Sequence, residues 1–171
     1  MLLEGLEKLI RAGVRRPLWG DVDPGCLVDL DRDAIGAMIP HRDPFLLIDG
    51  ISAIDVGNGR IRGRRVLSPD DPLFGGHFPG RPIYPGVLQV ETIGQLGLCL
   101  LESKAPARAE DARAVRIHHA VFLREVRPGA SLDVVAILLR SDEYGAVCAG
   151  QILEGDAICA FGILEVFFAG N

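Results

Sequence analysis

The sequence predicts an α+β domain in which a curved antiparallel sheet wraps around one long helix. The first observation is a long apolar segment, residues 87 to about 103, which contains no proline and is apolar on nearly every face, as an enclosed helix is. The second is a pair of strand-like runs before this segment. The third is a set of four strand-like runs after it, whose short separators are typical of antiparallel hairpins. Strands and helix segregated in this way are typical of α+β domains.

The chain begins with a segment that does not belong to the sheet pattern. Residues 1–14 have the apolar spacing of a short helix, and residues 15–30 hold prolines and glycines and are expected to be irregular. Asp31 can cap a second short helix that follows it. We therefore predict a partly helical N-terminal extension over residues 1–30 and a single domain over residues 31–171.

The strand-like runs follow a regular order. Residues 45–56 and 60–67 flank Gly57-Asn58-Gly59 and are predicted to form a hairpin. After the long helix, four further strands are expected, over residues 114–123, 131–140, 146–153 and 157–168.

The composition excludes several classes of protein. The chain has 171 residues, 49% of them hydrophobic, and a net charge of −5, which argues against nucleic-acid binding. Four cysteines form no CxxC pair, and this suits a reducing, cytoplasmic setting. The longest mostly apolar segment, residues 93–101, is about half of a membrane span, and the acidic residues near the N-terminus do not suit a signal peptide.

The most informative segment is a loop that leads into the long helix. Residues 76–86 read Gly-His-Phe-Pro-Gly-Arg-Pro-Ile-Tyr-Pro-Gly and cannot form regular structure, because proline removes backbone donors and glycine loosens φ. The loop carries His77, and the first turns of the helix carry Glu91. A base and an acid at opposite ends of a rigid loop predict an acid–base site.

Three motifs together resemble the β-hydroxyacyl-acyl-carrier-protein dehydratases. They are the loop with its helix start, residues 39–49 and residues 121–129, and the resemblance spans about residues 36–168. It implies the hot-dog fold, no cofactor, an acyl carrier protein as partner, and a role in fatty acid biosynthesis. It also implies a homodimer with the active sites at its interface, and several members assemble three such dimers.

The resemblance assigns roles to residues of the loop and helix. His77 of one subunit would face Glu91 of the other, and together they would dehydrate a 3-hydroxyacyl thioester to the trans-2-enoyl thioester. Neutral His77 would take the α-proton, and Glu91, or a water that it orients, would protonate the leaving hydroxyl. The sequence leaves open whether one or two residues carry out the proton transfers. The N–H groups of Gly86 and Val87 at the helix start can stabilise the enolate oxygen, and Gln95 can hold the Glu91 carboxyl.

Some positions depart from the family pattern. Glutamate at position 91 favours the branch that does not isomerise the double bond. Asp43 stands where an aromatic residue is common, Gly50 where many members have arginine, and Val121 where a basic residue is frequent. These departures leave the acid–base pair in place. They leave open the length and saturation of the acyl chain and whether the carrier is a carrier protein or coenzyme A. They also leave open whether the pathway makes fatty acids or polyketide-like products.

Several charged residues allow two interpretations. Arg60, Arg62 and Arg64 alternate along one strand and either guard a solvated strand edge or, with Arg81, dock the acidic carrier protein. A structural role is favoured for His41.

His118 and His119 are neighbours on one strand and are predicted to point to opposite faces. No metal-ligand spacing occurs in the sequence, so neither a metal nor an organic cofactor is expected.

Two other functions remain open from the sequence. A hot-dog acyl thioesterase would release a free thiol without an enoyl product. A non-catalytic subunit that binds acyl chains or supports a partner would lose nothing when His77 or Glu91 is replaced.

Overall fold

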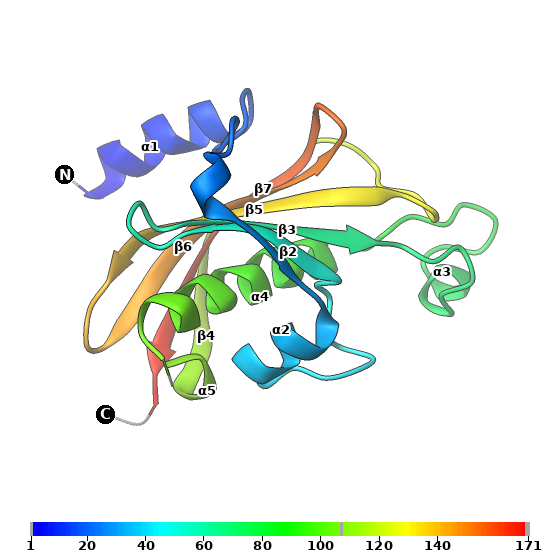
Figure 1. Ribbon diagram of the computed structural model, residues 1–171. Helices are drawn as coiled ribbons and strands as arrows, with labels where there is room; N and C mark the ends of the chain where they lie inside the picture. Colours follow the sequence, from blue (N-terminus) through cyan, green and yellow to red (C-terminus); the bar gives the residue numbers. More distant parts are fainter. Residues whose placement is uncertain (1, 107, 170–171) are drawn as a thin grey trace.

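One curved antiparallel sheet of seven strands forms the frame of the molecule (Figure 1). The computed structural model describes residues 2–106 and 108–169. Along the sheet the strand order is β1-β2-β3-β5-β6-β7-β4, and every neighbouring pair is antiparallel. The strands are β1 (Leu27–Leu30), β2 (Gly50–Asp55), β3 (Arg60–Val66), β4 (Ala112–Phe122), β5 (Ser131–Ser141), β6 (Gly145–Glu154) and β7 (Ala157–Phe168).

The long helix α4 (Gly86–Lys104) lies on one face of the sheet and packs against β5, β6 and β7 (Figure 1). Ile93, Leu96 and Leu100 are fully buried, as expected of a helix that is apolar on nearly every side. At Gly150 of β6 an added Cβ would lie 2.4 Å from Ile93, so the helix sits directly on the strand backbone. The predicted α+β class and hot-dog arrangement are confirmed.

Shorter helices lie around this frame: α1 (Leu2–Gly13), the 3-10 helix η1 (Pro24–Cys26), α2 (Arg32–Met38), α3 (Leu73–Gly76) and α5 (Arg108–Asp111). Asp31 caps α2 as predicted, since its Oδ1 accepts a hydrogen bond from the N–H of Ala34 at 3.0 Å. The N-terminal helix is confirmed from Leu2 onward, whereas Met1 lies outside the described residues. No helix in the described ranges is long and apolar enough to cross a membrane.

Two predictions about strands were wrong in part. Residues 27–30, expected to be irregular, form strand β1 and pair with β2, because four residues carry too little periodicity to reveal a strand. The hairpin is confirmed, but its first strand begins at Gly50 and not at residue 45.

The N-terminal segment covers the face of the sheet opposite α4 (Figure 1). Apolar side chains of α1 pack against Phe161 of β7. Beyond the end of α1, the N–H of Leu18 donates a hydrogen bond of 2.7 Å to the fully buried Gln151 of β6. Its Nε2 donates to the carbonyl oxygens of Gly13 and Arg16 at 2.5 and 2.9 Å. One buried amide thus holds the segment to the sheet.

His118 and His119 point to the same face of the sheet, so the prediction of opposite faces was wrong. The pairing of β4 with β7 shifts register between Ile117 and His119, and such a bulge breaks the alternation of side chains. The Nε2 of His118 lies 2.9 Å from the carboxylate of Glu165, and the ring of His119 lies 5.9 Å from that of Phe161.

Candidate active site

His77 is held in a defined tautomer at the end of α3. Its N–H donates to the carbonyl of Leu73 at 3.1 Å, and its own carbonyl accepts from the N–H of Ile83 at 2.9 Å. The ring Nδ1 lies 3.0 Å from the carbonyl oxygen of Ile83. A carbonyl can only accept, so Nδ1 carries the proton and Nε2 of the neutral ring keeps its lone pair. This is the form that a general base requires.

The loop after His77 is fixed by its own backbone. Phe78 and Arg81 exchange two hydrogen bonds of 3.2 and 3.0 Å across a tight turn. Gly80 adopts a φ of 76° within it, in the left-handed region that favours glycine. The N–H of Tyr84 then donates to the carbonyl of Val126 at 2.7 Å. The predicted irregular loop is confirmed for residues 77–85, whereas Gly76 ends α3 and Gly86 begins α4.

The start of α4 offers unused backbone donors. The N–H groups of Leu88 and Gln89 both bond to the carbonyl of Pro85 at 3.1 Å. Among the described residues no side chain caps this end, which leaves the N–H groups of Gly86 and Val87 to the pocket. An added Cβ on Gly86 would lie 2.7 Å from the ring of Phe122, so only glycine fits without displacing that ring.

His77, Gly86 and Val87 line one pocket of about 470 Å³. Phe122 at the end of β4 and residues 123–125 after it also line this pocket. The structure thus brings together the candidate base and the two candidate oxyanion donors, which lie nine and ten residues further along the sequence.

Glu91 lies in a different pocket, held by two polar neighbours. Its Oε1 accepts a hydrogen bond from the Nε2 of Gln95 at 2.9 Å and lies 3.4 Å from the Nε2 of His41. Gln95 is fully buried, and it also donates to the carbonyl of Phe45 and accepts from the N–H of Leu47, both at 2.8 Å. Since three bonds fix Gln95, it can orient the Glu91 carboxyl as expected.

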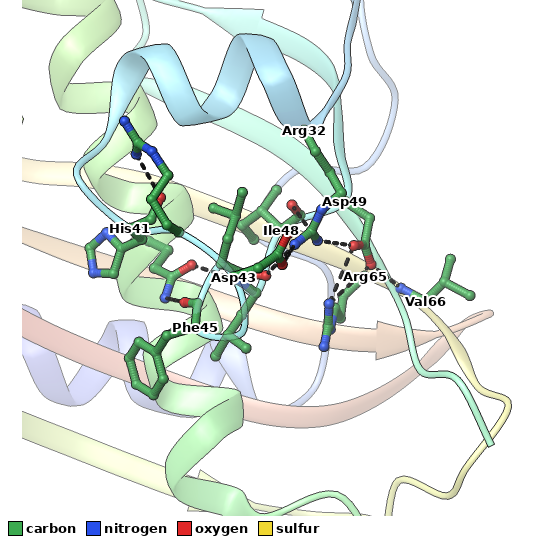
Figure 2. Close-up of polar contacts among 12 residues, drawn as sticks. Arg32, His41, Asp43, Phe45, Ile48, Asp49, Arg65 and Val66 are labelled. Carbon is green, nitrogen blue, oxygen red and sulfur yellow. Dashed lines mark hydrogen bonds and ion pairs between the residues drawn. The ribbon is translucent and has the colours of Figure 1, made fainter. Parts of the chain in front are cut away.

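His41 was expected to be structural, but it lies beside the candidate acid. Its ring stacks on that of Phe45 with 6.4 Å between centroids (Figure 2), and its Nδ1 is buried without a partner in the described chain. The sequence signal that could have placed His41 in the site is the motif of residues 39–49. This motif also contains Phe45 and Leu47, which form hydrogen bonds with Gln95.

The pocket of Glu91 is narrow and apolar, with a volume of about 120 Å³. From Glu91 it follows one side of α4 past Gly94 and Leu98 to Leu101, and Cys148 of β6 lies on its wall. Burial raises the pKa of the Cys148 thiol to about 12. This thiol is therefore protonated near neutral pH and cannot act as a nucleophile there.

A polar network anchors the segment that carries His41 and Phe45 (Figure 2). Arg32 of α2 pairs with the carboxylates of Asp43 and Asp49. Asp49 also accepts from the guanidinium of Arg65 at 3.3 Å and from the N–H of Val66 at 2.7 Å. Asp43, which departs from the family pattern, thus supports the loop by an ion pair.

Within one chain the candidate base and acid lie in two separate pockets. His77 lines the pocket at the start of α4, whereas Glu91 lines the apolar pocket beside Gln95. The two groups therefore do not line a common pocket within one chain.

The alternating arginines of β3 hold the N-terminal segment. The Nη2 of Arg62 donates to the carbonyls of Trp19 and Gly20 at 2.6 and 3.1 Å, and Arg60 lies 4.9 Å from the centre of the Trp19 ring. Strand β3 lies inside the sheet, between β2 and β5, so it is not an edge. The interpretation of a solvated strand edge was therefore wrong, and Arg60 and Arg62 have intramolecular contacts with the N-terminal segment.

Arg64 and Arg81 differ from that pair. Arg64 packs on Gly50, its cross-strand neighbour, where an added Cβ would lie 2.6 Å from its Nε. Arg81 is 73% exposed and pairs at 2.5 Å with Glu125, which lines the His77 pocket. Arg81 thus contacts a residue that lines this pocket, although it does not line the pocket itself.

Solved structures share the fold at low sequence identity. The dehydratase heterocomplex ApeI:P from Xenorhabdus doucetiae matches with a TM-score of 0.64 at 18% identity, over 78% of this chain and 90% of that chain. A putative thioesterase from Ralstonia eutropha matches with a TM-score of 0.55 at 16% identity, over 68% and 82%. The fold alone therefore does not separate the two activities.

The sequence relatives are more specific. The 3-hydroxyacyl-acyl-carrier-protein dehydratase FabZ of Natranaerobius thermophilus is 34% identical over 78% of this chain and 94% of its own length. FabZ of Bacillus subtilis is 33% identical over 82% and 97%. The profile of the FabA-like domain matches residues 39–161. The chain therefore belongs to the β-hydroxyacyl-acyl-carrier-protein dehydratase family.

Proposed function

We propose that this protein dehydrates 3-hydroxyacyl groups, carried on acyl carrier protein, to trans-2-enoyl thioesters in fatty acid biosynthesis. Family membership supports the reaction. The observation that carries it is the pocket in which His77, with its Nε2 lone pair free, lies with the unused N–H groups of Gly86 and Val87. A base and oxyanion donors side by side suit abstraction of a proton next to a carbonyl.

The reaction requires two proton transfers, and a different residue carries out each of them. The Nε2 of His77 takes a proton from the carbon next to the thioester carbonyl, and negative charge develops on the carbonyl oxygen. The N–H groups of Gly86 and Val87 stabilise that charge, aided by the helix dipole. Glu91 gives a proton to the departing hydroxyl, so that water leaves and the double bond forms. Gln95 keeps the Glu91 carboxyl in position.

We further propose a homodimer in which His77 of one subunit meets Glu91 of the other. Two observations support it. The two residues line separate pockets within one chain. Strand β4 lies at the edge of the sheet, and its Val115 and Ile117 are each 58% exposed. An apolar edge strand is a template for pairing with another chain.

The carrier protein is proposed to approach the pocket of His77. Arg81 is exposed beside this pocket, and an acidic group of the carrier protein would compete with Glu125 for its guanidinium. We place the reaction in the cytoplasm because all four cysteines are free thiols, the form that a reducing compartment maintains.

The hydration of a trans-2-enoyl thioester tests the activity, because the reverse reaction is followed by loss of ultraviolet absorbance. We expect hydration by the wild type, and a loss of at least about hundredfold in His77→Ala and Glu91→Gln. Thermal unfolding checks that each variant is folded. Release of free thiol without interconversion of enoyl and hydroxyacyl thioester would instead assign a thioesterase. Full activity in both folded variants would remove these residues from the mechanism.

A further inference from the structure

One buried side chain in the wall of the His77 pocket has an acceptor without a partner. Gln89 is 2% exposed and lines this pocket together with His77 and Gly86. Its Nε2 donates to the carbonyl oxygen of Tyr84 at 3.3 Å. Its Oε1 is buried and accepts no hydrogen bond from any described residue. A buried acceptor that has lost its water without gaining a donor destabilises the fold.

The orientation of this amide follows from its neighbour. The opposite assignment would place the Oε1 of Gln89 against the carbonyl of Tyr84, so that two acceptors would face each other. The Nε2 therefore faces Tyr84, and the Oε1 is the group left free.

Other buried polar groups of α4 are satisfied. The Oγ1 of Thr92 donates to the carbonyl of Leu88 at 2.7 Å and lies 3.3 Å from the hydroxyl of Tyr84. Gln95 makes three hydrogen bonds. The free acceptor is therefore a local feature of the wall beside His77, and not a general property of the helix interior.

The place of Gln89 indicates which part of a substrate would reach it. The apolar pocket that suits an acyl chain begins at Glu91. The pocket of Gln89 is bordered instead by the polar residues Arg124 and Glu125. A thioester carbonyl at the N–H of Gly86 would thus have its carrier arm in the pocket of Gln89. Such an arm carries an amide N–H two carbons from the sulfur, and that N–H is the first hydrogen-bond donor along the arm.

We propose that the Oε1 of Gln89 accepts a hydrogen bond from this amide N–H, which makes Gln89 a specificity residue for thioesters of an amide-bearing carrier arm. The inference rests on the proposed function, because it needs the thioester carbonyl at the start of α4. An apolar side chain of equal length would fill the same space but could not accept a hydrogen bond from the amide N–H.

The test pairs one variant with one change in the substrate. The two substrates are the trans-2-enoyl thioester of N-acetylcysteamine and its analogue in which oxygen replaces the amide N–H. In the wild type we expect kcat/KM to be roughly threefold to tenfold higher for the amide, mainly through KM. In Gln89→Met we expect a ratio close to one. Gln89→Leu serves as a second variant should the methionine variant fail to fold.

The matched control is Thr92→Val, which removes a satisfied polar group from the same helix and should keep the wild-type ratio. Gln89→Met removes the unpaired acceptor but also the donor to the carbonyl of Tyr84, so thermal unfolding of each variant checks that it is folded. An equal amide-to-oxygen ratio in the wild type and the Gln89 variants overturns the inference. A wild type that hydrates neither substrate contradicts the proposed function itself, so the two failures are distinguishable.

Discussion

At the scale of single residues, the site depends on side chains whose orientation is fixed by backbone carbonyls. The carbonyl of Ile83 fixes the tautomer of His77, and the carbonyl of Phe45 helps to fix Gln95. The candidate base and the support of the candidate acid are therefore set by the fold before a substrate binds. Such preorganisation is what an acid–base mechanism needs, because small misplacements are costly.

Replacement of Gly86 by alanine tests the close approach at the start of α4. The new Cβ would lie 2.7 Å from the ring of Phe122, which lines the same pocket, so the ring or the start of the helix would have to shift. We expect kcat/KM for enoyl hydration to fall by about hundredfold, the size of losing an oxyanion donor. The double variant Gly86→Ala/Phe122→Ala removes the clash with the ring. Recovery of activity in the double variant would show that the clash with the Phe122 ring, and not a blocked approach of the substrate carbonyl, caused the loss of kcat/KM.

Replacement of Gln95 by methionine tests its role in positioning Glu91. We expect kcat to fall by about tenfold to hundredfold at nearly unchanged KM, because the carboxyl loses its orientation. The unpaired N–H of Leu47 should cost about 1–3 kcal/mol of unfolding free energy. Gln151→Met is the matched control, since Gln151 also makes three buried bonds but only holds the N-terminal segment. A similar loss of kcat per folded molecule in the control would contradict the positioning role.

At the scale of elements, the sequence predicts what depends on local pattern. The apolar run of α4, the cap at Asp31 and the hairpin around residues 57–59 were all correct because their signals are local. Strand β1 was missed because its pairing with β2 is a tertiary contact. The arginines of β3 were misread because the sequence does not show that residues 19–20 return to that strand.

The hairpin turn between β2 and β3 predicts a dependence of stability on pH. The pKa of Asp55 is lowered from 3.8 to about 2, first by a hydrogen bond from the Asn58 side chain and then by one from Arg60. A carboxyl whose pKa is lower in the folded chain stabilises the fold when ionised. This contribution is complete above pH of about 4 and is lost as the pH falls toward 2.

Asp55→Asn is expected to remove that dependence. Chemical unfolding of both proteins between pH 6 and pH 2 should show the variant to be less stable near pH 6, with a difference that shrinks toward pH 2. A difference of constant size over this whole range would mean that packing at the turn, and not the charge of Asp55, stabilises the hairpin.

At the scale of the whole molecule, the two faces of the sheet have different roles: one carries the candidate site, and the other binds the N-terminal segment. Residues of α4 line both candidate pockets. The opposite face of the sheet is covered by α1 (Figure 1) and by the segment that Gln151 holds. Local pattern supplies the loop, the helix and the residue types of the site. Local pattern does not reveal which subunit contributes His77 and which contributes Glu91 to one site, because that depends on an interface between two folded chains.

Subunit complementation tests the shared site directly. His77→Ala and Glu91→Gln are each expected to be nearly inactive as homodimers. After unfolding and refolding as an equal mixture, half of the dimers should be mixed, and one of their two sites should hold His77 of one chain and Glu91 of the other. About a quarter of the wild-type activity should therefore return, because association of the two chains is random. If base and acid came from the same chain, each mixed dimer would contain only damaged sites, and activity would stay at the level of the separate variants.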